Sequence, residues 1–87
     1  MYINFQRKTF DAYFRRFLVS GKNYAIFFKD NVQDTYAIAM KPEPIKNYCG
    51  LPVLKVIDVK SLENQEPEFV WKLFEQTLKE LDVSEDF

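Results

Sequence analysis

Residues 23–40 read NYAIFFKDNVQDTYAIAM, and they constrain the fold more strongly than any other part of this 87-residue chain. Two runs, 23–29 and 35–40, are rich in the aromatic and β-branched residues that are typical of strands. The segment between them, Asp30 to Asp34, consists mostly of turn-forming residues. Two strands joined by about five turn residues predict a β-hairpin.

The chain on the C-terminal side of the hairpin predicts a third strand. Proline cannot donate to a strand ladder, so Pro42 and Pro44 end the second strand, and a loop to Gly50 follows. Residues 51–59, LPVLKVIDV, are apolar on most of both faces of the strand that they predict. Because the hairpin strands are also apolar on both faces, we expect one face of the sheet to be bare and to pair with a second copy.

A helix at 66–82 is the clearest single element. Pro67 suits the first helical position, where its missing N–H leaves no intrahelical hydrogen bond unmade. Residues 83–87 are expected to form a frayed tail. The predicted core-facing stripe comprises Phe69, Val70, Leu73, Phe74, Leu78 and Leu81, with Trp71 on its rim.

A second helix is expected near residues 9–20, with Thr9 as its N-cap and Gly21 just beyond its end. Apolar and polar side chains alternate weakly over residues 2–5, which add at most one further strand. The predicted fold is therefore a single small α+β domain over 1–87, in the order α-β-β-β-α. Its two helices pack on a three-stranded antiparallel sheet, or on a four-stranded one if residues 2–5 join it.

The composition excludes several classes of function. The chain has no His, so it lacks the usual general base and the usual transition-metal ligand. Its single cysteine, Cys49, forbids an intramolecular disulfide and a structural zinc site. Two Gly residues are too few for a loop that cradles phosphate. We expect no catalytic residue, no cofactor and no metal, and therefore no enzyme.

Two weaker chemical candidates remain. Cys49 lies in a loop without a neighbouring base, so its thiol is expected to stay protonated. Asp30, Asp34 and Asp58 would gather around a hard cation only if the hairpin turn and the end of the third strand met. Turn formation is the expected role of these aspartates.

The sequence also predicts where the protein acts. The longest uninterrupted apolar run, Tyr24 to Phe28, is far shorter than the roughly 20 residues that span a bilayer. No charged start leads into an apolar run, so we expect no signal peptide, a cytoplasmic location and no membrane contact. Residues with AT-rich codons are abundant, which suggests an AT-rich genome such as that of a low-GC bacterium or its phages.

Charge is distributed unevenly along a chain whose formal net charge is −1. Residues 1–29 hold six Lys or Arg against one acid, whereas residues 61–87 hold two Lys against eight acids. The two ends either neutralise each other in the folded chain or serve different partners. The nucleic-acid-binding candidates at the basic end are Arg7, Lys8, Arg15, Arg16 and Lys22.

Two segments are candidates for protein binding. On the last helix, Trp71 lies on the rim of the apolar stripe and is bordered by carboxylates, as an interface anchor would be. The alternative is that Trp71 only laps over the edge of the core. The proline-spaced segment 41–48 would present Ile45 and Tyr48, unless it only connects two strands. The candidates on the helix and its tail are Trp71, Glu75, Leu78, Asp82, Glu85 and Asp86.

These features predict a small, non-catalytic protein-binding factor that occupies the surface of a host or cognate protein. Its size, acidic C-terminal third and AT-rich composition suit an inhibitor from a phage or mobile element. A nucleic-acid-binding protein or a defence enzyme of the host is the expected target, because an acidic helix can imitate a phosphate backbone. The alternatives are a nucleic-acid-associated accessory protein that uses the basic end, or a subunit or homodimer paired through an apolar sheet face. A sequence pI of about 5.4 places nucleic acid below protein as a partner.

Overall fold

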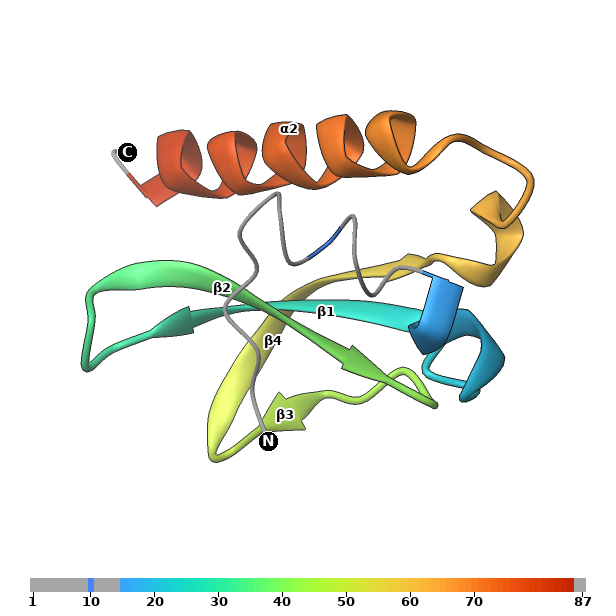
Figure 1. Cartoon of the computed structure of the whole chain (residues 1–87). Coiled ribbons are helices and arrows are strands. Elements are labelled where there is room, and N and C mark those ends of the chain that lie inside the picture. Colours follow the sequence, from blue (N-terminus) through green and yellow to red (C-terminus); the bar gives the residue numbers. More distant parts are fainter. Residues whose placement is uncertain (1–9, 11–14, 86–87) are drawn as a thin grey trace.

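The protein folds into one antiparallel sheet with a long helix lying across it (Figure 1). The structure, a computed structural model, describes Phe10 and residues 15–85, without the side chains of residues 83–85. The strand order in the sheet is β2-β1-β4-β3. The elements are β1 (Tyr24–Asp30), β2 (Thr35–Lys41), β3 (Asn47–Tyr48), β4 (Leu51–Asp58), the 3-10 helix η1 (Lys60–Leu62) and α2 (Pro67–Glu85).

A helical segment precedes the strands, so the predicted α+β order is confirmed. Residues 15–19 are helical, as is Phe10. The segment ends at Gly21, whose φ is 81°, and the amides of Gly21 and Lys22 bond back to the carbonyls of Leu18 and Phe17. This pair of hydrogen bonds is the Schellman motif that a C-terminal glycine favours. The expected N-cap Thr9 and the weak strand at 2–5 lie outside the described residues.

The predicted hairpin is confirmed. β1 and β2 pair in an antiparallel register that runs from Tyr24↔Lys41 to Asp30↔Thr35. On its other edge β1 pairs with β4, so β1 lies inside the sheet. A break in that register between Phe27 and Phe28 marks a bulge, and such irregularities bend a strand.

The strand β3 is an addition to the predicted fold, which had a loop up to Gly50. Tyr48 pairs with Leu51 across a turn formed by Cys49 and Gly50, whose φ angles are 51° and 79°. Two consecutive residues with positive φ define the type I′ turn, whose backbone twist matches that of the flanking strands. Glycine adopts this conformation freely but cysteine rarely does, so the sequence carries only half of the usual signal.

One face of the sheet packs against α2 and holds the larger hydrophobic cluster. Phe74 of α2 meets Phe27 of β1 edge to face, with ring centroids 5.6 Å apart. Phe10 packs against both Phe74 and Trp71 of the helix, at 5.4 and 5.3 Å. The buried members of the cluster are Phe10, Phe17, Ala25, Phe27, Ile38, Met40, Val59, Val70, Trp71 and Phe74.

The helix α2 is rotated about its axis relative to the prediction. Trp71, expected on the rim, is only 8% exposed, whereas Phe69, expected in the core-facing stripe, is 52% exposed. The buried face of α2 is therefore shifted toward Trp71 and away from Phe69. The contact between Phe10 and Trp71 gives the physical reason, because the N-terminal helical segment covers that side of α2.

The opposite face of the β1–β2 hairpin is covered as well, so the expectation of a bare sheet face is wrong there. The chain leaves β2, crosses this face and enters β3, on the far side of the sheet from α2 (Figure 1). Tyr48 of β3 packs on Phe28 of β1 with ring centroids 4.9 Å apart. Ala37 and Ala39 of β2 complete the buried part of this second cluster.

The two residues expected to be displayed on segment 41–48 belong to this second cluster. Tyr48 is buried, and Ile45 packs against the cluster while remaining half-buried. The nitrogen Nζ of Lys41 lies 4.8 Å from the centroid of the Tyr48 ring. Burial, followed by the influence of the neighbouring Cys49 thiol, raises the pKa of the Tyr48 hydroxyl above its ordinary value. The segment therefore serves as a cover for the sheet.

No helix in the described part of the chain is both long enough and apolar enough to cross a membrane.

Replacing Tyr48 by Phe tests the second cluster. The Tyr48 hydroxyl is buried without a hydrogen-bond partner among the described residues, and an unsatisfied buried hydroxyl costs stability. We expect Tyr48→Phe to raise the free energy of unfolding by about 1 kcal/mol. Tyr48→Ala, which also removes the ring, should lower it by about 3 kcal/mol. Urea denaturation measures both, and a loss of stability in Tyr48→Phe would contradict the packing described.

Candidate functional site

Two grooves lie at opposite ends of the sheet, and each is lined by side chains of both charges. Arg15 of the N-terminal helical segment and Lys60 of η1 line the same groove, close to the end of the sheet where Tyr24 pairs with Asp58. At the other end, Asp34 of the hairpin turn and Asp82 of α2 line a second groove together with two lysines. Figure 1 shows the hairpin turn and the C-terminal end of α2 on one side of the molecule, and η1 on the other.

The expectation that the two termini neutralise each other gains no support from the ion pairs between described residues. Lys60 pairs with Glu63 at 2.6 Å, and Lys72 with Glu68 at 3.5 Å, so both pairs are local. The third pair, between Lys29 and Asp34, links β1 to the hairpin turn that follows it. None of these three pairs joins residues 1–29 to residues 61–87.

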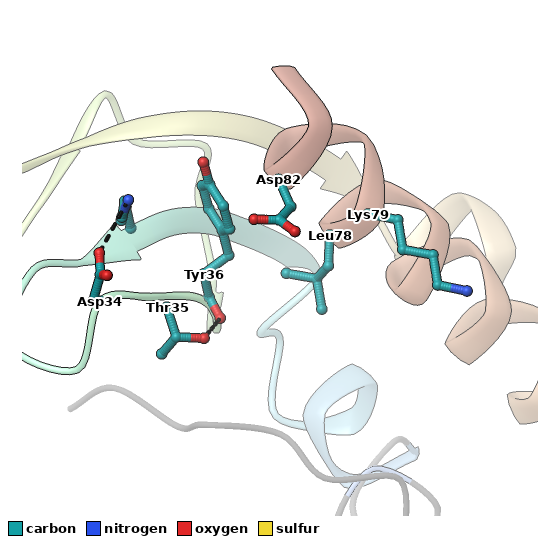
Figure 2. A pocket seen from close by; sticks show the side chains of 7 residues that line it. Asp34, Thr35, Tyr36, Leu78, Lys79 and Asp82 are labelled. Carbon is teal, nitrogen blue, oxygen red and sulfur yellow. Dashed lines mark hydrogen bonds and ion pairs between the residues drawn. The ribbon is translucent and has the colours of Figure 1, made fainter. Parts of the chain in front are cut away.

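The groove beside the hairpin turn has a volume of about 390 Å³ and lies between the β1–β2 turn and the C-terminal half of α2 (Figure 2). The Tyr36 ring stands beside the Asp82 carboxylate, whereas the Lys79 side chain points away from the groove. Tyr36 and Leu78 are half-buried, so an apolar surface remains open between the charged side chains. The residues that line the groove are Lys29, Asp34, Thr35, Tyr36, Leu78, Lys79 and Asp82.

The hairpin turn beside the groove is held by its own side chains. The Oδ1 atom of Asp30 accepts hydrogen bonds from the amides of Val32 and Gln33, at 2.9 and 3.3 Å. Nζ of Lys29 lies 3.2 Å from Oδ1 of Asp34, whose φ is 53°. These contacts fix the backbone of the turn, and they leave Val32 96% exposed at its tip.

Lys29 also connects the turn to the groove. Its Nζ atom lies 5.5 Å from the centroid of the Tyr36 ring, within the range of a cation–π contact. The same ammonium group therefore faces the Asp34 carboxylate and the ring that stands in the groove. The turn and the groove form one surface, which we call the turn–groove surface and define as Val32 with the seven lining residues.

Sequence reasoning found part of this surface. Leu78 and Asp82 were predicted and do line the groove, and Glu75, seven residues before Asp82, is exposed on α2. Trp71, predicted on the rim either as an interface anchor or as a residue that laps over the core edge, is buried against Phe10 and is therefore not available as an anchor. The side chain of Glu85 and the whole of Asp86 lie outside the described residues.

The hairpin residues of the surface were missed. The polarity of Asp30–Asp34 was interpreted as a connecting turn, and the exposure of Val32 depends on how tightly that turn is fixed. The only available signal was an apolar residue, Val32, between four turn-forming ones. Tyr36 gave no signal of its own, because an aromatic residue in a strand is usually part of a core.

The structure describes three of the five basic residues that were predicted as candidates for nucleic-acid binding. Arg15, Arg16 and Lys22 are all exposed, and the first two belong to the helical segment that ends at Gly21. Arg7 and Lys8 lie outside the described residues. A shallow groove beside Arg15 is also lined by Val19, Lys60 and Glu63, so this surface is of mixed charge at its edge.

The aspartate cluster that could have held a cation does not form. Asp58 pairs with Tyr24 at one end of β1, whereas Asp30 and Asp34 flank the turn at its other end. Throughout Phe10 and residues 15–82, no three Cys, Asp or Glu side chains come close enough to hold a metal ion. Cys49 is exposed at the tip of the β3–β4 turn.

Comparison of the chain with family models, with curated proteins and with solved structures finds no significant match. What the turn–groove surface can bind therefore has to follow from its own shape and charges.

Substitution of Asp30 tests whether its carboxylate fixes the turn. Asp30→Ala removes the acceptor of two backbone amides and should lower the free energy of unfolding by about 1–2 kcal/mol. It should also accelerate hydrogen exchange of the Val32 amide. Asp30→Asn keeps the Oδ1 acceptor and should lose less than about 0.5 kcal/mol. Equal losses in the two variants, measured by urea denaturation, would contradict the capping role.

Proposed function

We propose that this chain is a non-catalytic protein-binding factor whose contact surface is the turn–groove surface. The observation that carries the proposal is Val32, an apolar side chain that is 96% exposed on a turn fixed by Asp30. A large exposed fraction on a rigid turn suits binding, because little conformational entropy is lost when a partner covers the side chain.

The groove supplies the other features of a protein interface. The half-buried side chains of Tyr36 and Leu78 offer an apolar floor for a side chain of the partner, and tyrosine is enriched among interface hot spots. Asp34, Asp82 and Lys29 place charges of both signs beside this floor, which would select for complementary charges on the partner. The partner would thus cover Val32 and place an apolar side chain against Tyr36.

The acidic face of α2 contributes to this surface as a border of mixed charge. Glu68, Glu75 and Asp82 follow one another at intervals of seven residues, but Lys72 and Lys79 lie next to them on the helix. Lys72 is paired with Glu68. A row of carboxylates interrupted by lysines is a poor imitation of a phosphate backbone, so we propose recognition by shape and mixed charge.

Within this class, an inhibitor from a phage or mobile element remains the version that the sequence favours. Its support is the small size of the chain and its AT-rich composition. Such a factor acts by covering a surface that its target needs, and it requires no chemistry of its own. The binding experiment below would identify the host protein that this factor covers.

The proposal predicts that capture of a partner depends on Val32. The tagged full-length chain is incubated with nuclease-treated lysate of the source cells, and captured proteins are quantified by mass spectrometry. We expect one stoichiometric protein with the wild type and at least about a tenfold weaker capture with Val32→Glu, because a charge would be buried at the interface.

Val19→Glu is the matched control, because Val19 is 89% exposed on the N-terminal helical segment, at the other end of the sheet. It should capture the partner as the wild type does. Equal capture by wild type and Val32→Glu would contradict the proposed surface.

A second candidate function, association with nucleic acid, is favoured by the exposure of Arg15, Arg16 and Lys22 near one end of the sheet. Contacts of these cations with phosphates would be strongly weakened by salt. The same experiment without nuclease separates the two functions. Proteins that appear only when nucleic acid is intact, and that disappear when Arg15 and Lys22 are replaced by Glu, would favour the accessory role.

A further inference from the structure

One carboxylate of the turn–groove surface has no counterion. Asp82 is exposed on α2, and its side chain makes no ion pair or hydrogen bond with Phe10 or any of residues 15–82. The two lysines of the groove do not neutralise it, because Nζ of Lys29 lies 3.2 Å from Oδ1 of Asp34, and Lys79 points away from the groove (Figure 2). Since Lys29 and Asp34 compensate each other, Asp82 supplies the uncompensated charge inside the groove.

The side chains next to Asp82 add an aromatic and an aliphatic surface. The Tyr36 ring stands beside the Asp82 carboxylate (Figure 2), and Leu78 lies one helical turn before Asp82 on α2. Both side chains are half-buried and line the same groove. The ring already lies within cation–π range of one cation, Nζ of Lys29, at 5.5 Å. A carboxylate beside an aromatic ring and a leucine suits a cationic side chain with an apolar stem.

We propose that the groove takes an arginine side chain of the partner protein. The guanidinium group would donate two parallel hydrogen bonds to the Asp82 carboxylate, next to the Tyr36 ring. The methylene stem would lie on Leu78 and Tyr36. This inference rests on the proposed function, and it identifies the apolar group that the partner places against Tyr36 as the stem of this arginine.

Arginine fits the groove better than the other charged side chains. An acidic side chain or a phosphate would meet the Asp82 carboxylate, and the nearest ammonium group, that of Lys29, is already paired with Asp34. A lysine would neutralise Asp82, but its compact ammonium group cannot bond to both carboxylate oxygens in one plane or stack on a ring. An isolated surface ion pair contributes little, so the pair depends on the cover that the rest of the partner gives it.

Titration with a small arginine probe tests the groove without the partner. N-acetyl-arginine methylamide is added to the ¹⁵N-labelled full-length chain at low, constant ionic strength, and amide chemical shifts are followed by NMR. We expect shifts concentrated at Tyr36, Leu78 and Asp82, with a dissociation constant in the millimolar range that rises with salt. The neutral citrulline analogue should cause no such shifts, and the lysine analogue should bind more weakly.

Variants of α2 make the test specific. Asp82→Asn keeps the shape of the side chain but removes its charge, and should weaken binding of the arginine probe at least about fivefold. Glu75→Gln is the matched control, because Glu75 is exposed on α2 and does not line the groove, and it should bind the probe as the wild type does. The proposal is overturned if the groove amides do not shift, or if citrulline, lysine or Asp82→Asn gives binding equal to that of arginine and the wild type.

The same variants separate this inference from the proposed function. In the capture experiment, Asp82→Asn should retain at least about fivefold less partner than the wild type, and Glu75→Gln should retain as much. If Val32→Glu leaves capture unchanged, the proposed binding surface is wrong, whatever the arginine probe shows. If Val32→Glu reduces capture but Asp82→Asn does not, the surface stands and the arginine is overturned.

Discussion

The burial of β1 on both faces is the constraint that the rest of the fold satisfies. Ala25, Ile26, Phe27 and Phe28 are consecutive, and each is exposed by 2% or less. Successive side chains of a strand point to opposite faces, so two separate covers are required. α2 supplies one cover, where Phe74 meets Phe27, and β3 supplies the other, where Tyr48 meets Phe28.

The first cover was predictable from the sequence and the second was not. Helical spacing around Phe74 predicts α2, and the two apolar runs predict the hairpin, because both patterns are local and periodic. The return of the chain over Phe28 depends on a turn in which Cys49 adopts a positive φ. Cysteine is not a usual residue for this turn, so the two residues of β3 looked like part of a loop.

The difference between local patterns and contacts made only in the folded chain also explains which residues of the candidate site could be predicted. Leu78 could be assigned to the edge of the apolar stripe, and Asp82 to the exposed surface beside it, from their positions on a helix alone. Trp71 could not be placed correctly, because its burial results from the contact with Phe10, which is distant in sequence. The role of Val32 depends on a side chain, that of Asp30, which binds the backbone of the turn. A contact of this kind is visible only in three dimensions.

The positions of the two covers of β1 also determine which parts of the protein remain exposed. The covers of β1 extend over β2, and α2 leaves a groove where its C-terminal half passes the hairpin turn. β4, on the other side of β1, receives less of both covers. The turn–groove surface and the exposed residues of β4 are therefore both consequences of how a small chain covers one central strand.

The most direct test of this account compares substitutions on the two faces of β1. Phe27→Leu and Phe28→Leu make the same chemical change at neighbouring positions, one under α2 and the other under β3. We predict that urea denaturation shows a loss of about 1–2 kcal/mol in the free energy of unfolding for both variants. A normal loss for Phe27→Leu together with a loss below about 0.5 kcal/mol for Phe28→Leu would show that the second face is open, and would contradict the account.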